Sequence, residues 1–402
     1  MIRRFIVAFF GVVALTFILP EARAADWPRW RGPEGNGISR ETRWNPQALA
    51  GGPKVLWQAS IGIGFSSVAV SGGSVYTMGN QSGTDTVYCF DLETGREVWT
   101  HSYPCAVGSY PGPRATPTVE DGIVYTLSRE GHLFALDAAT GRVRWQRHLA
   151  RDFGAVAPGW DFAGSPVIAG ERIVLNASRS GLAVDKNSGK ALWISARGSA
   201  GYATPVLAEL RGRPGVVIFG ETATYGVELD SGDVLWSFDW RNSSEVNAAD
   251  PVVFDDKVFV ASAYGKGCAL YDVSGRSPRV IWQNNLFETH FSSFVYLDGH
   301  LYGIDGDARR ASGGVLRCVE AATGREAWSK QVGFGSLIAV DGHLVVLNSS
   351  GTIFVAEATP AGYRELSQAS LPRDQYWSPP AFAQGRLFVR NLRGGLFAVD
   401  MR

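Results

Sequence analysis

Residues 136–145 read LDAATGRVRW, in which a tryptophan follows a turn glycine by four positions. Similar stretches recur along the chain, and five of them keep this glycine-to-tryptophan spacing. The five pairs are Gly95/Trp99, Gly141/Trp145, Gly189/Trp193, Gly232/Trp236 and Gly324/Trp328. An aspartate such as Asp137 accepts backbone N–H groups across a tight turn, and glycine adopts the positive φ angle that such a turn needs. Each copy therefore predicts a hairpin that leads into a strand with a tryptophan.

The spacing of the copies gives the number of repeats. A stretched copy ends at Trp282, a seventh has Leu366 in place of the tryptophan, and Trp57 lies in a matching stretch near the N-terminus. Together the eight positions are 57, 99, 145, 193, 236, 282, 328 and 366. A period in the forties with short strands is typical of a β-propeller that has one four-stranded blade per repeat. We therefore predict an all-β, eight-bladed propeller over residues 51–402.

The last repeat, GGLFAVDMR, stops at Arg402 before its final strand. The stretch GPKVLWQAS, residues 52–60, has the composition of that strand. We predict that this N-terminal strand completes the last blade, because an open ring would leave strand edges exposed. We also predict that the repeated tryptophans wedge between blades, since a single ligand would need its contacts only once. These structural residues are Trp57, Trp99, Trp145, Trp193, Trp236, Trp282 and Trp328.

The first residues have the pattern of an export signal. Arg3 and Arg4 precede an apolar run and the small-residue stretch 22–24, which predicts a signal peptide over residues 1–24, with an uncleaved anchor as the alternative. Export to the periplasm or beyond follows, with no membrane span after cleavage. Residues 25–50 are expected to form a strap across the propeller, with Trp27 and Trp30 packed down and no chemistry of their own.

Charge and cysteine usage exclude several functions. The chain has 38 basic and 38 acidic residues, so no basic field would attract nucleic acid. Of the four cysteines, Cys89 and Cys318 occupy equivalent positions in non-adjacent repeats, too far apart for a disulfide, and buried free thiols are expected. No zinc site is predicted, because no C-x-x-C or H-x-x-x-H spacing occurs. The loop 303–314 is interpreted as a solvated loop.

A candidate ligand site comes from the residues just before each inner strand, where the chain crosses between blades. These residues are Phe65, Arg114, Phe162, Tyr202, Asn247, Phe291, Phe334 and Trp377. The crossings lie on one face, so they are expected to converge on a funnel, and an aromatic funnel with a few polar groups suits a ligand or peptide. Trp160, Asp161, Glu245 and His290 are added as neighbours. Blade packing is the alternative role for the aromatic rings.

The pattern A-x-D-x-x-T-G-x-x-x-W, clearest at residues 135–145, resembles the PQQ-like β-propeller repeat family over nearly the whole chain. That family includes assembly factors of the BamB type, which this chain resembles in size and blade count, and quinoprotein alcohol dehydrogenases, which bind pyrroloquinoline quinone (PQQ) and calcium. The chain lacks the lipid-carrying cysteine of the former and the adjacent cysteine pair of the latter. The segment Trp160–Gly164, WDFAG, is similar to a stretch of some of those dehydrogenases.

These observations predict an exported, monomeric, non-catalytic propeller that recognises a protein, peptide or glycan at its funnel, with no cofactor and no metal. No nucleophile elbow or phosphate-binding loop occurs in the chain. The alternative is a PQQ- and calcium-dependent oxidoreductase that uses Trp160 and Asp161.

Overall fold

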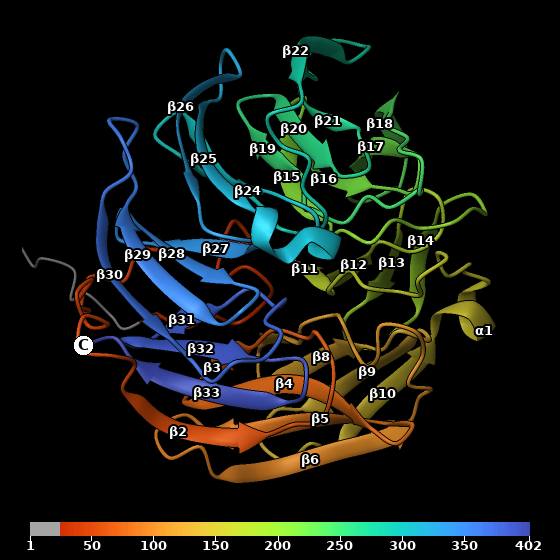
Figure 1. Ribbon diagram of the computed structural model, residues 1–402. Helices are drawn as coiled ribbons and strands as arrows, with labels where there is room; N and C mark the ends of the chain where they lie inside the picture. Colours follow the sequence, from red (N-terminus) through yellow and green to blue (C-terminus); the bar gives the residue numbers. More distant parts are fainter. Residues whose placement is uncertain (1–24) are drawn as a thin grey trace, which may run out of the picture.

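The computed structural model describes residues 25–402, so the predicted signal peptide lies outside the described residues. Eight β-sheets stand around a central axis, and the chain passes once around the ring (Figure 1). Within each blade, neighbouring strands are antiparallel. The predicted all-β, eight-bladed propeller is confirmed.

The first four blades each consist of four consecutive strands, numbered from the inside outward. Blade 1 contains β3 (Ala69–Ser71), β4 (Ser74–Gln81), β5 (Thr84–Asp91) and β6 (Glu97–Pro104). Blade 2 contains β7 (Thr118–Glu120), β8 (Ile123–Leu127), β9 (His132–Asp137) and β10 (Val143–His148), followed by the short helix α1 (Leu149–Phe153). Blade 3 contains β11 (Val167–Ala169), β12 (Arg172–Leu175), β13 (Leu182–Asp185) and β14 (Ala191–Ile194). Blade 4 contains β15 (Val206–Leu210), β16 (Arg213–Phe219), β17 (Ala223–Glu228) and β18 (Val234–Asp239).

The last four blades follow the same order, and blades 7 and 8 also receive N-terminal strands. Blade 5 contains β19 (Val252–Phe254), β20 (Lys257–Ser262), β21 (Gly267–Asp272) and β22 (Arg279–Asn284). Blade 6 contains β23 (Val295–Leu297), β24 (His300–Asp305), the 3-10 helix η1 (Ala308–Gly313), β25 (Val315–Glu320) and β26 (Arg325–Gln331). Blade 7 contains β27 (Gly335–Val340), β28 (His343–Asn348), β29 (Thr352–Glu357) and β30 (Glu365–Ser370), with β1 (Ile38–Ser39) beside β27. Blade 8 contains β31 (Ala381–Ala383), β32 (Arg386–Arg390), β33 (Gly395–Asp400) and β2 (Val55–Ser60).

The repeated tryptophans lie on the outermost strands and bridge neighbouring blades. The indole N–H of Trp145, for example, donates to the carbonyl of Lys186 in the next blade at 2.9 Å. Its ring also covers the turn glycine Gly189, where an added Cβ would lie 2.7 Å from the ring. The same donation to the following blade is made by Trp57, Trp99, Trp193, Trp282 and Trp328.

Trp236 differs, because its buried indole N–H has no acceptor among the described residues. Replacing Trp145 with phenylalanine therefore removes a hydrogen bond as well as packing, whereas Trp236→Phe removes only packing. We expect Trp145→Phe to lower the free energy of unfolding by about 1 kcal/mol more than Trp236→Phe. Urea denaturation of the two variants measures the difference, and equal losses would contradict this role of the indole nitrogen.

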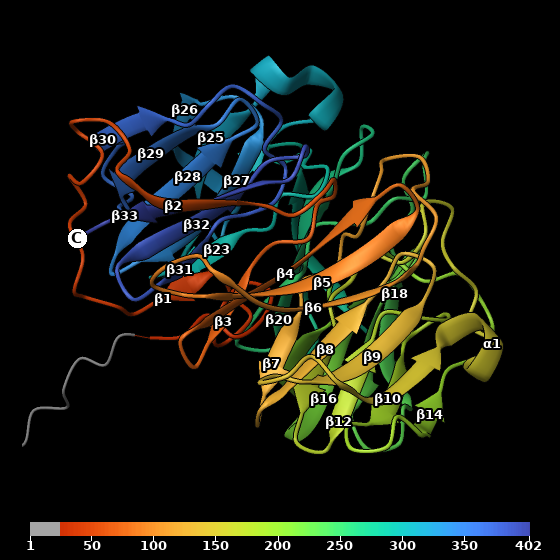
Figure 2. The ribbon, with the colours of Figure 1, turned by 90° about the horizontal axis from the view of Figure 1, so that it is seen from below.

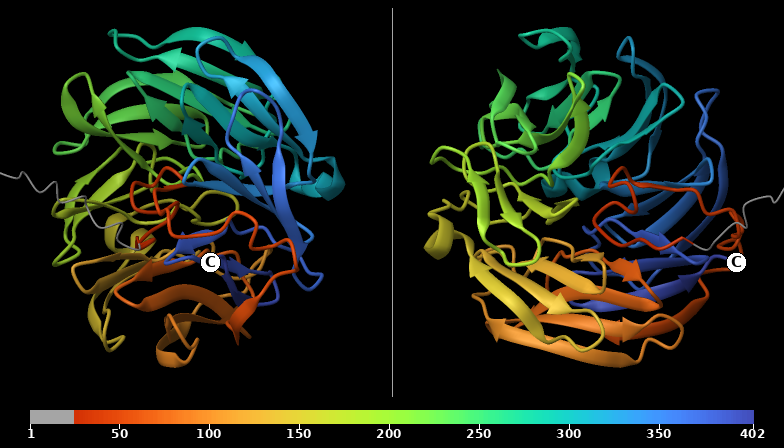
Figure 3. Two further views of the ribbon diagram at one scale, coloured as in Figure 1. Left: turned by 90° about the vertical axis from the view of Figure 1, so that its left-hand side faces the viewer. Right: turned by 180° about the vertical axis from the view of Figure 1, so that it is seen from behind.

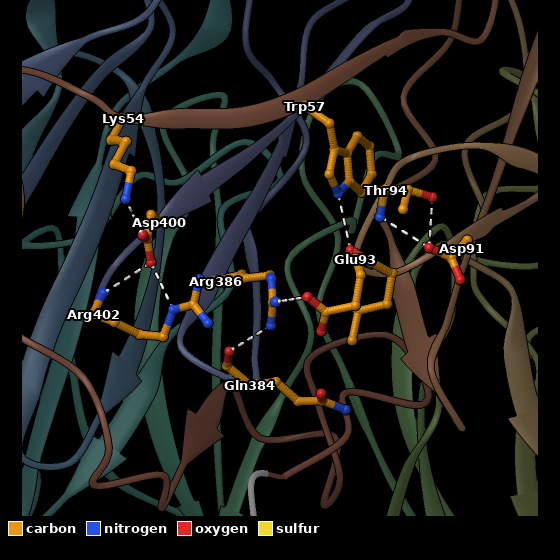
Figure 4. Close-up of polar contacts among 10 residues, drawn as sticks. Lys54, Trp57, Asp91, Glu93, Thr94, Gln384, Arg386, Asp400 and Arg402 are labelled. Atoms are coloured by element: carbon orange, nitrogen blue, oxygen red, sulfur yellow. Dashed lines mark hydrogen bonds and ion pairs between the residues drawn. The ribbon is translucent and has the colours of Figure 1, made fainter.

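The ring closes in blade 8, where β2 pairs antiparallel with β33, as predicted from the incomplete last repeat (Figure 2). Close by, Lys54 forms an ion pair of 2.9 Å with Asp400, and Arg386 pairs with Glu93 of blade 1 (Figure 4). The Trp57 indole donates to the carbonyl of Leu92 at 2.9 Å (Figure 4). Segments from the two ends of the chain thus hold the ring together without a covalent link.

Residues 25–50, which we call the strap, begin along the inner strands and then run outward to β30 of blade 7, where Ser367 donates its hydroxyl to the carbonyl of Pro46 (Figure 3). Trp27 is buried and bridges Val70 of blade 1, and the carbonyl of Pro28 accepts the N–H of Val119 in blade 2 at 2.8 Å. Farther along, β1 pairs in parallel with β27 of blade 7. The strap therefore joins blades from both sides of the ring closure.

All four cysteines lie in the described part of the chain and are buried and free, as the sequence predicts. Over residues 25–402, no helix has both the length and the apolar character needed to cross a bilayer.

Candidate functional site

An aromatic funnel opens at the end of the channel where the chain crosses from one blade to the next. It encloses a cavity of about 470 Å³, to which several blades and the strap contribute side chains. The aromatic residues of the lining are Trp30, Phe65, Tyr110, Trp160, Tyr202, Tyr264, Phe291 and Trp377. The charged or titratable residues are Arg114, Asp250, His290 and Arg309.

A belt of hydroxyl side chains at the start of the inner strands fixes the crossing segments. The N–H of Thr116 donates to Ser165 Oγ at 2.9 Å, and the N–H of Ser165 donates to Thr204 Oγ1 at 3.0 Å. The N–H of Thr204 then donates to Asp250 Oδ1 at 2.8 Å, and the N–H of Asp250 to Ser293 Oγ at 3.1 Å. In blades 3 to 6 a side chain of the belt thus accepts a backbone N–H of the preceding blade, and these bonds fix the crossing segments at the funnel.

Asp250 replaces the hydroxyl residue at one position of the belt, and there the strap enters the funnel. Trp30 reaches from the strap and donates its indole N–H to Asp250 Oδ2 at 2.6 Å. Arg31, also buried, lies 3.7 Å from the same oxygen. Burial raises the pKa of Asp250, and the charge of Arg31 opposes that rise. We expected no chemistry from the strap, but Trp30 lies in the lining of the cavity.

Arg114 is held at the funnel by backbone carbonyls. Its guanidinium donates to the carbonyls of Trp160, Ser109 and Tyr110, and none of the ion pairs formed within residues 25–402 involves it. Burial lowers the pKa of Arg114 to about 10. Tyr110 and Trp160 lie next to it with 50% and 43% of their surface exposed, and their rings meet edge-to-face at 5.3 Å. The mouth of the funnel therefore presents two accessible aromatic rings in contact, with the guanidinium of Arg114 bound to the backbone carbonyls of both residues.

A second polar group lines another part of the funnel. Tyr264 Oη lies 2.8 Å from His290 Nε2, and the guanidinium of Arg309 stands 4.9 Å from the centre of the Tyr264 ring. Burial lowers the pKa of His290, while the charge of Asp307 acts in the opposite direction. Arg309 belongs to the loop that we expected to be only solvated. The side chain of Arg309 is indeed exposed, and η1 also places it in the lining of the cavity.

Seven of the twelve predicted site residues line the cavity. They are Phe65, Arg114, Trp160, Tyr202, His290, Phe291 and Trp377. Their rings contact one another, with Phe65 stacked on Trp377 at 5.7 Å and Phe291 at 5.3 Å from Trp377.

The other five predicted residues lie outside the lining. Asn247 is fully buried, and its amide donates to the carbonyls of Gly220, Glu221 and Trp240. It therefore satisfies backbone groups at the crossing instead of facing the funnel.

The remaining four residues are either buried in the core or held in ion pairs outside the lining. Phe162 is buried in a core cluster of blades 2 and 3, and Phe334 is buried with its ring 5.0 Å from Phe291. Asp161 forms an ion pair with Arg129. Glu245 pairs with Arg241, 2.9 Å away.

Five aromatic or charged lining residues are absent from the predicted set: Trp30, Tyr110, Asp250, Tyr264 and Arg309. Tyr264 and Arg309 lie in the connections between the second and third strands of their blades, which end on the same face as the crossings. Their place in these connections is the sequence signal that could have identified Tyr264 and Arg309 as lining residues. The repeat carries no information about the path of the strap, so nothing marked Trp30.

The lining of the funnel offers few of the oxygen ligands that a quinone site with calcium would need. Calcium takes six to eight oxygen ligands. Among the described lining residues Asp250 is the only carboxylate; it already accepts from Trp30 and Thr204 and forms an ion pair with Arg31. Asp161, the other predicted carboxylate, is paired with Arg129. These residues do not form the converging carboxylates that calcium binding in the funnel would need.

Comparison with known proteins gives one family. The family model described as "Outer membrane protein assembly factor BamB" matches residues 48–214 and 83–310. The outer membrane protein assembly factor BamB of Yersinia pestis is 22% identical over 381 residues, which cover 86% of this chain and 88% of that protein.

Two solved structures share the fold at low sequence identity. BamB from Moraxella catarrhalis superimposes with a TM-score of 0.61 at 17% identity, covering 86% of this chain and 98% of that one. Quinohemoprotein alcohol dehydrogenase from Comamonas testosteroni gives a TM-score of 0.69 at 13% identity, covering 94% and 81%. The same propeller therefore occurs in an assembly factor and in an enzyme, and the fold does not select between them. From the family match, this chain belongs to the BamB family of PQQ-like β-propellers.

Proposed function

We propose that this protein is an exported, monomeric, non-catalytic propeller that binds a protein partner by taking an extended segment of it into the funnel. The observation that carries the proposal is the mouth of the funnel, where the exposed rings of Tyr110 and Trp160 meet next to Arg114. Aromatic residues and arginine are enriched in protein interfaces and dominate their binding energy.

The size of the cavity limits what enters it. A volume of about 470 Å³ accommodates a few side chains, not a folded domain. The aromatic walls favour apolar or aromatic side chains, and Arg114 favours an acidic side chain or a C-terminal carboxylate. A flexible segment of a partner protein that carries acidic and aromatic side chains fits the volume of the cavity, its aromatic walls and the charge of Arg114.

The relatives support a protein partner over a glycan. The Yersinia pestis relative is named as an assembly factor for outer membrane proteins, and it aligns with most of this chain. A periplasmic or secreted location agrees with that relationship. Aromatic walls also suit sugar rings, so carbohydrate binding is the outcome that the experiment must separate from peptide binding.

The test uses residues 25–402 immobilised for selection from a random peptide phage library. Enriched peptides are then titrated in solution by fluorescence anisotropy. We expect Trp160→Ala and Arg114→Gln each to weaken binding about 30-fold, the effect of losing a hot-spot side chain. Leu192→Ala, at an equally exposed residue of β14, and Arg364→Gln serve as matched controls and should bind as the wild type does.

Two results would overturn the proposal. One is a set of selected peptides whose binding is unchanged by both funnel substitutions. The other is an oligosaccharide, found on a glycan array, that depends on Trp160 while no peptide is enriched.

A further inference from the structure

Outside the funnel, the interface between blades 1 and 2 contains an unusual gathering of titratable side chains. His101 and Tyr103 on β6 and Cys105 just after it follow one another at every second position and face blade 2. There His132 of β9 lies with its ring 5.4 Å from Tyr103 and 4.8 Å from His148. Three of the six histidines and two of the four cysteines of the chain thus lie in a single interface.

We propose that Cys105, Glu130 and His132 form a binding site for a transition-metal ion of the Zn²⁺ type, with Asp85 as a further ligand. A sulfur atom, a ring nitrogen and a carboxylate oxygen of the first three residues all lie within 4.8 Å of one another. Thiolate, imidazole and carboxylate are the donor set that zinc prefers.

The geometry needs only a small adjustment to close on an ion. Zinc bonds of about 2.0–2.3 Å place tetrahedral ligands somewhat closer together than 4.8 Å. Cys105 is buried, whereas Glu130 and His132 are half-buried, so an ion has access from solvent and the Glu130 side chain has room to rotate. Ser128 Oγ, 3.1 Å from His132 Nδ1, orients the imidazole from behind, as outer-shell partners of metal ligands do.

Asp85 gives an independent indication of a cation-binding site. Its side chain is completely buried; Oδ1 accepts from Asn80 at 2.7 Å, but Oδ2 has no hydrogen-bond partner among the described residues. A buried carboxylate oxygen without a partner is costly, and a metal ion would satisfy it.

Sequence spacing could not show this site, and our expectation of no zinc site rested on spacing alone. Cys105 lies at the start of the crossing from blade 1 to blade 2, and Glu130 and His132 lie at the turn between β8 and β9. The neighbouring Arg129 of the same turn holds Asp161 beside Trp160. A metal ion at this interface would therefore fix the turn that supports one wall of the funnel.

The test is metal binding by residues 25–402, prepared without a histidine tag and dialysed against a chelator. Wild-type protein titrated with Zn²⁺ against a chromophoric chelator should bind one equivalent more tightly at pH 8 than at pH 6, because binding displaces protons. Titration with Co²⁺ should give the absorption band of a thiolate–cobalt bond. Cys105→Ser and His132→Gln should abolish the site, and Asp85→Asn should weaken it 10- to 100-fold.

Matched controls are Cys268→Ser, at a buried cysteine of blade 5, and His300→Gln, at a hairpin of blade 6; both should bind as the wild type does. Glu130→Gln, at a half-buried position, tests the site without emptying the core if Cys105→Ser fails to fold. A wild type that binds no Zn²⁺ would overturn the proposal, and so would binding by the Cys105, Glu130 and His132 variants equal to that of the wild type.

Discussion

Replacing Gly141 with alanine is expected to lower the free energy of unfolding by about 2–5 kcal/mol. Gly141 has a φ of 70°, which costs other residues about 1–2 kcal/mol. The new Cβ would also lie 2.6 Å from the Trp99 ring, and such overpacking adds about 1–3 kcal/mol. Urea denaturation of the variant measures the loss.

Gly122 offers a matched control in the same blade. Its φ is 74°, but a Cβ there would have no neighbour within 4 Å. Gly122→Ala should therefore lower the free energy of unfolding by only about 1–2 kcal/mol, the cost of the positive φ angle. Equal losses at the two glycines would show that the tryptophan contact contributes nothing, and would contradict the structural role of the repeat.

The second large effect is expected where the strap meets the funnel. Arg31→Met leaves the Asp250 carboxylate buried without its cation, and removing one partner of a buried ion pair costs about 3–5 kcal/mol. The same substitution should loosen the strap, because Arg31 also donates to the carbonyls of Asn36 and Phe294. Thermal and urea denaturation report the stability, and limited proteolysis within residues 25–50 reports the strap.

A double variant separates the charge from the packing. Asp250→Ser restores at this position the kind of side chain that Thr204 and Ser293 supply in the adjacent blades. Combined with Arg31→Met, it removes the uncompensated charge while keeping an acceptor for the Thr204 N–H. The double variant should be more stable than Arg31→Met alone. If the stability losses of Arg31→Met and Asp250→Ser simply add in the double variant, the two residues do not act as a coupled ion pair.

The architecture was predictable because the repeat is encoded locally. Each blade uses a turn glycine and an aromatic residue on its outer strand, so the same sequence pattern recurs along the chain. The period of the pattern gives the number of blades. Leu366 in blade 7 and the longer turn before Trp282 show how far a copy departs without losing the fold. The closing strand was found because Trp57 kept the same pattern.

The site was only half predictable, since it depends on which side of a crossing each residue faces. Phe291 and Phe334 have the same place in their repeats, yet Phe291 lines the cavity and Phe334 is buried behind it. Trp30 arrives from a segment outside the repeat. Cys105 and His132 are likewise brought together by the packing of two blades, which no local pattern records.

We propose that the funnel binds a segment of a partner protein. The repeated tryptophans, in contrast, hold the blades together. Trp30, Trp160 and Trp377 line the cavity, so tryptophan fluorescence of residues 25–402 reports its occupation directly. The decisive measurement titrates the wild type and Trp160→Ala with a library-selected peptide and, in parallel, with PQQ and calcium. We predict saturable quenching by the peptide, shifted to an about 30-fold higher peptide concentration in Trp160→Ala, and no saturable response to PQQ with calcium. Saturable quenching by PQQ with calcium, accompanied by dye-linked alcohol oxidation, would contradict the claim.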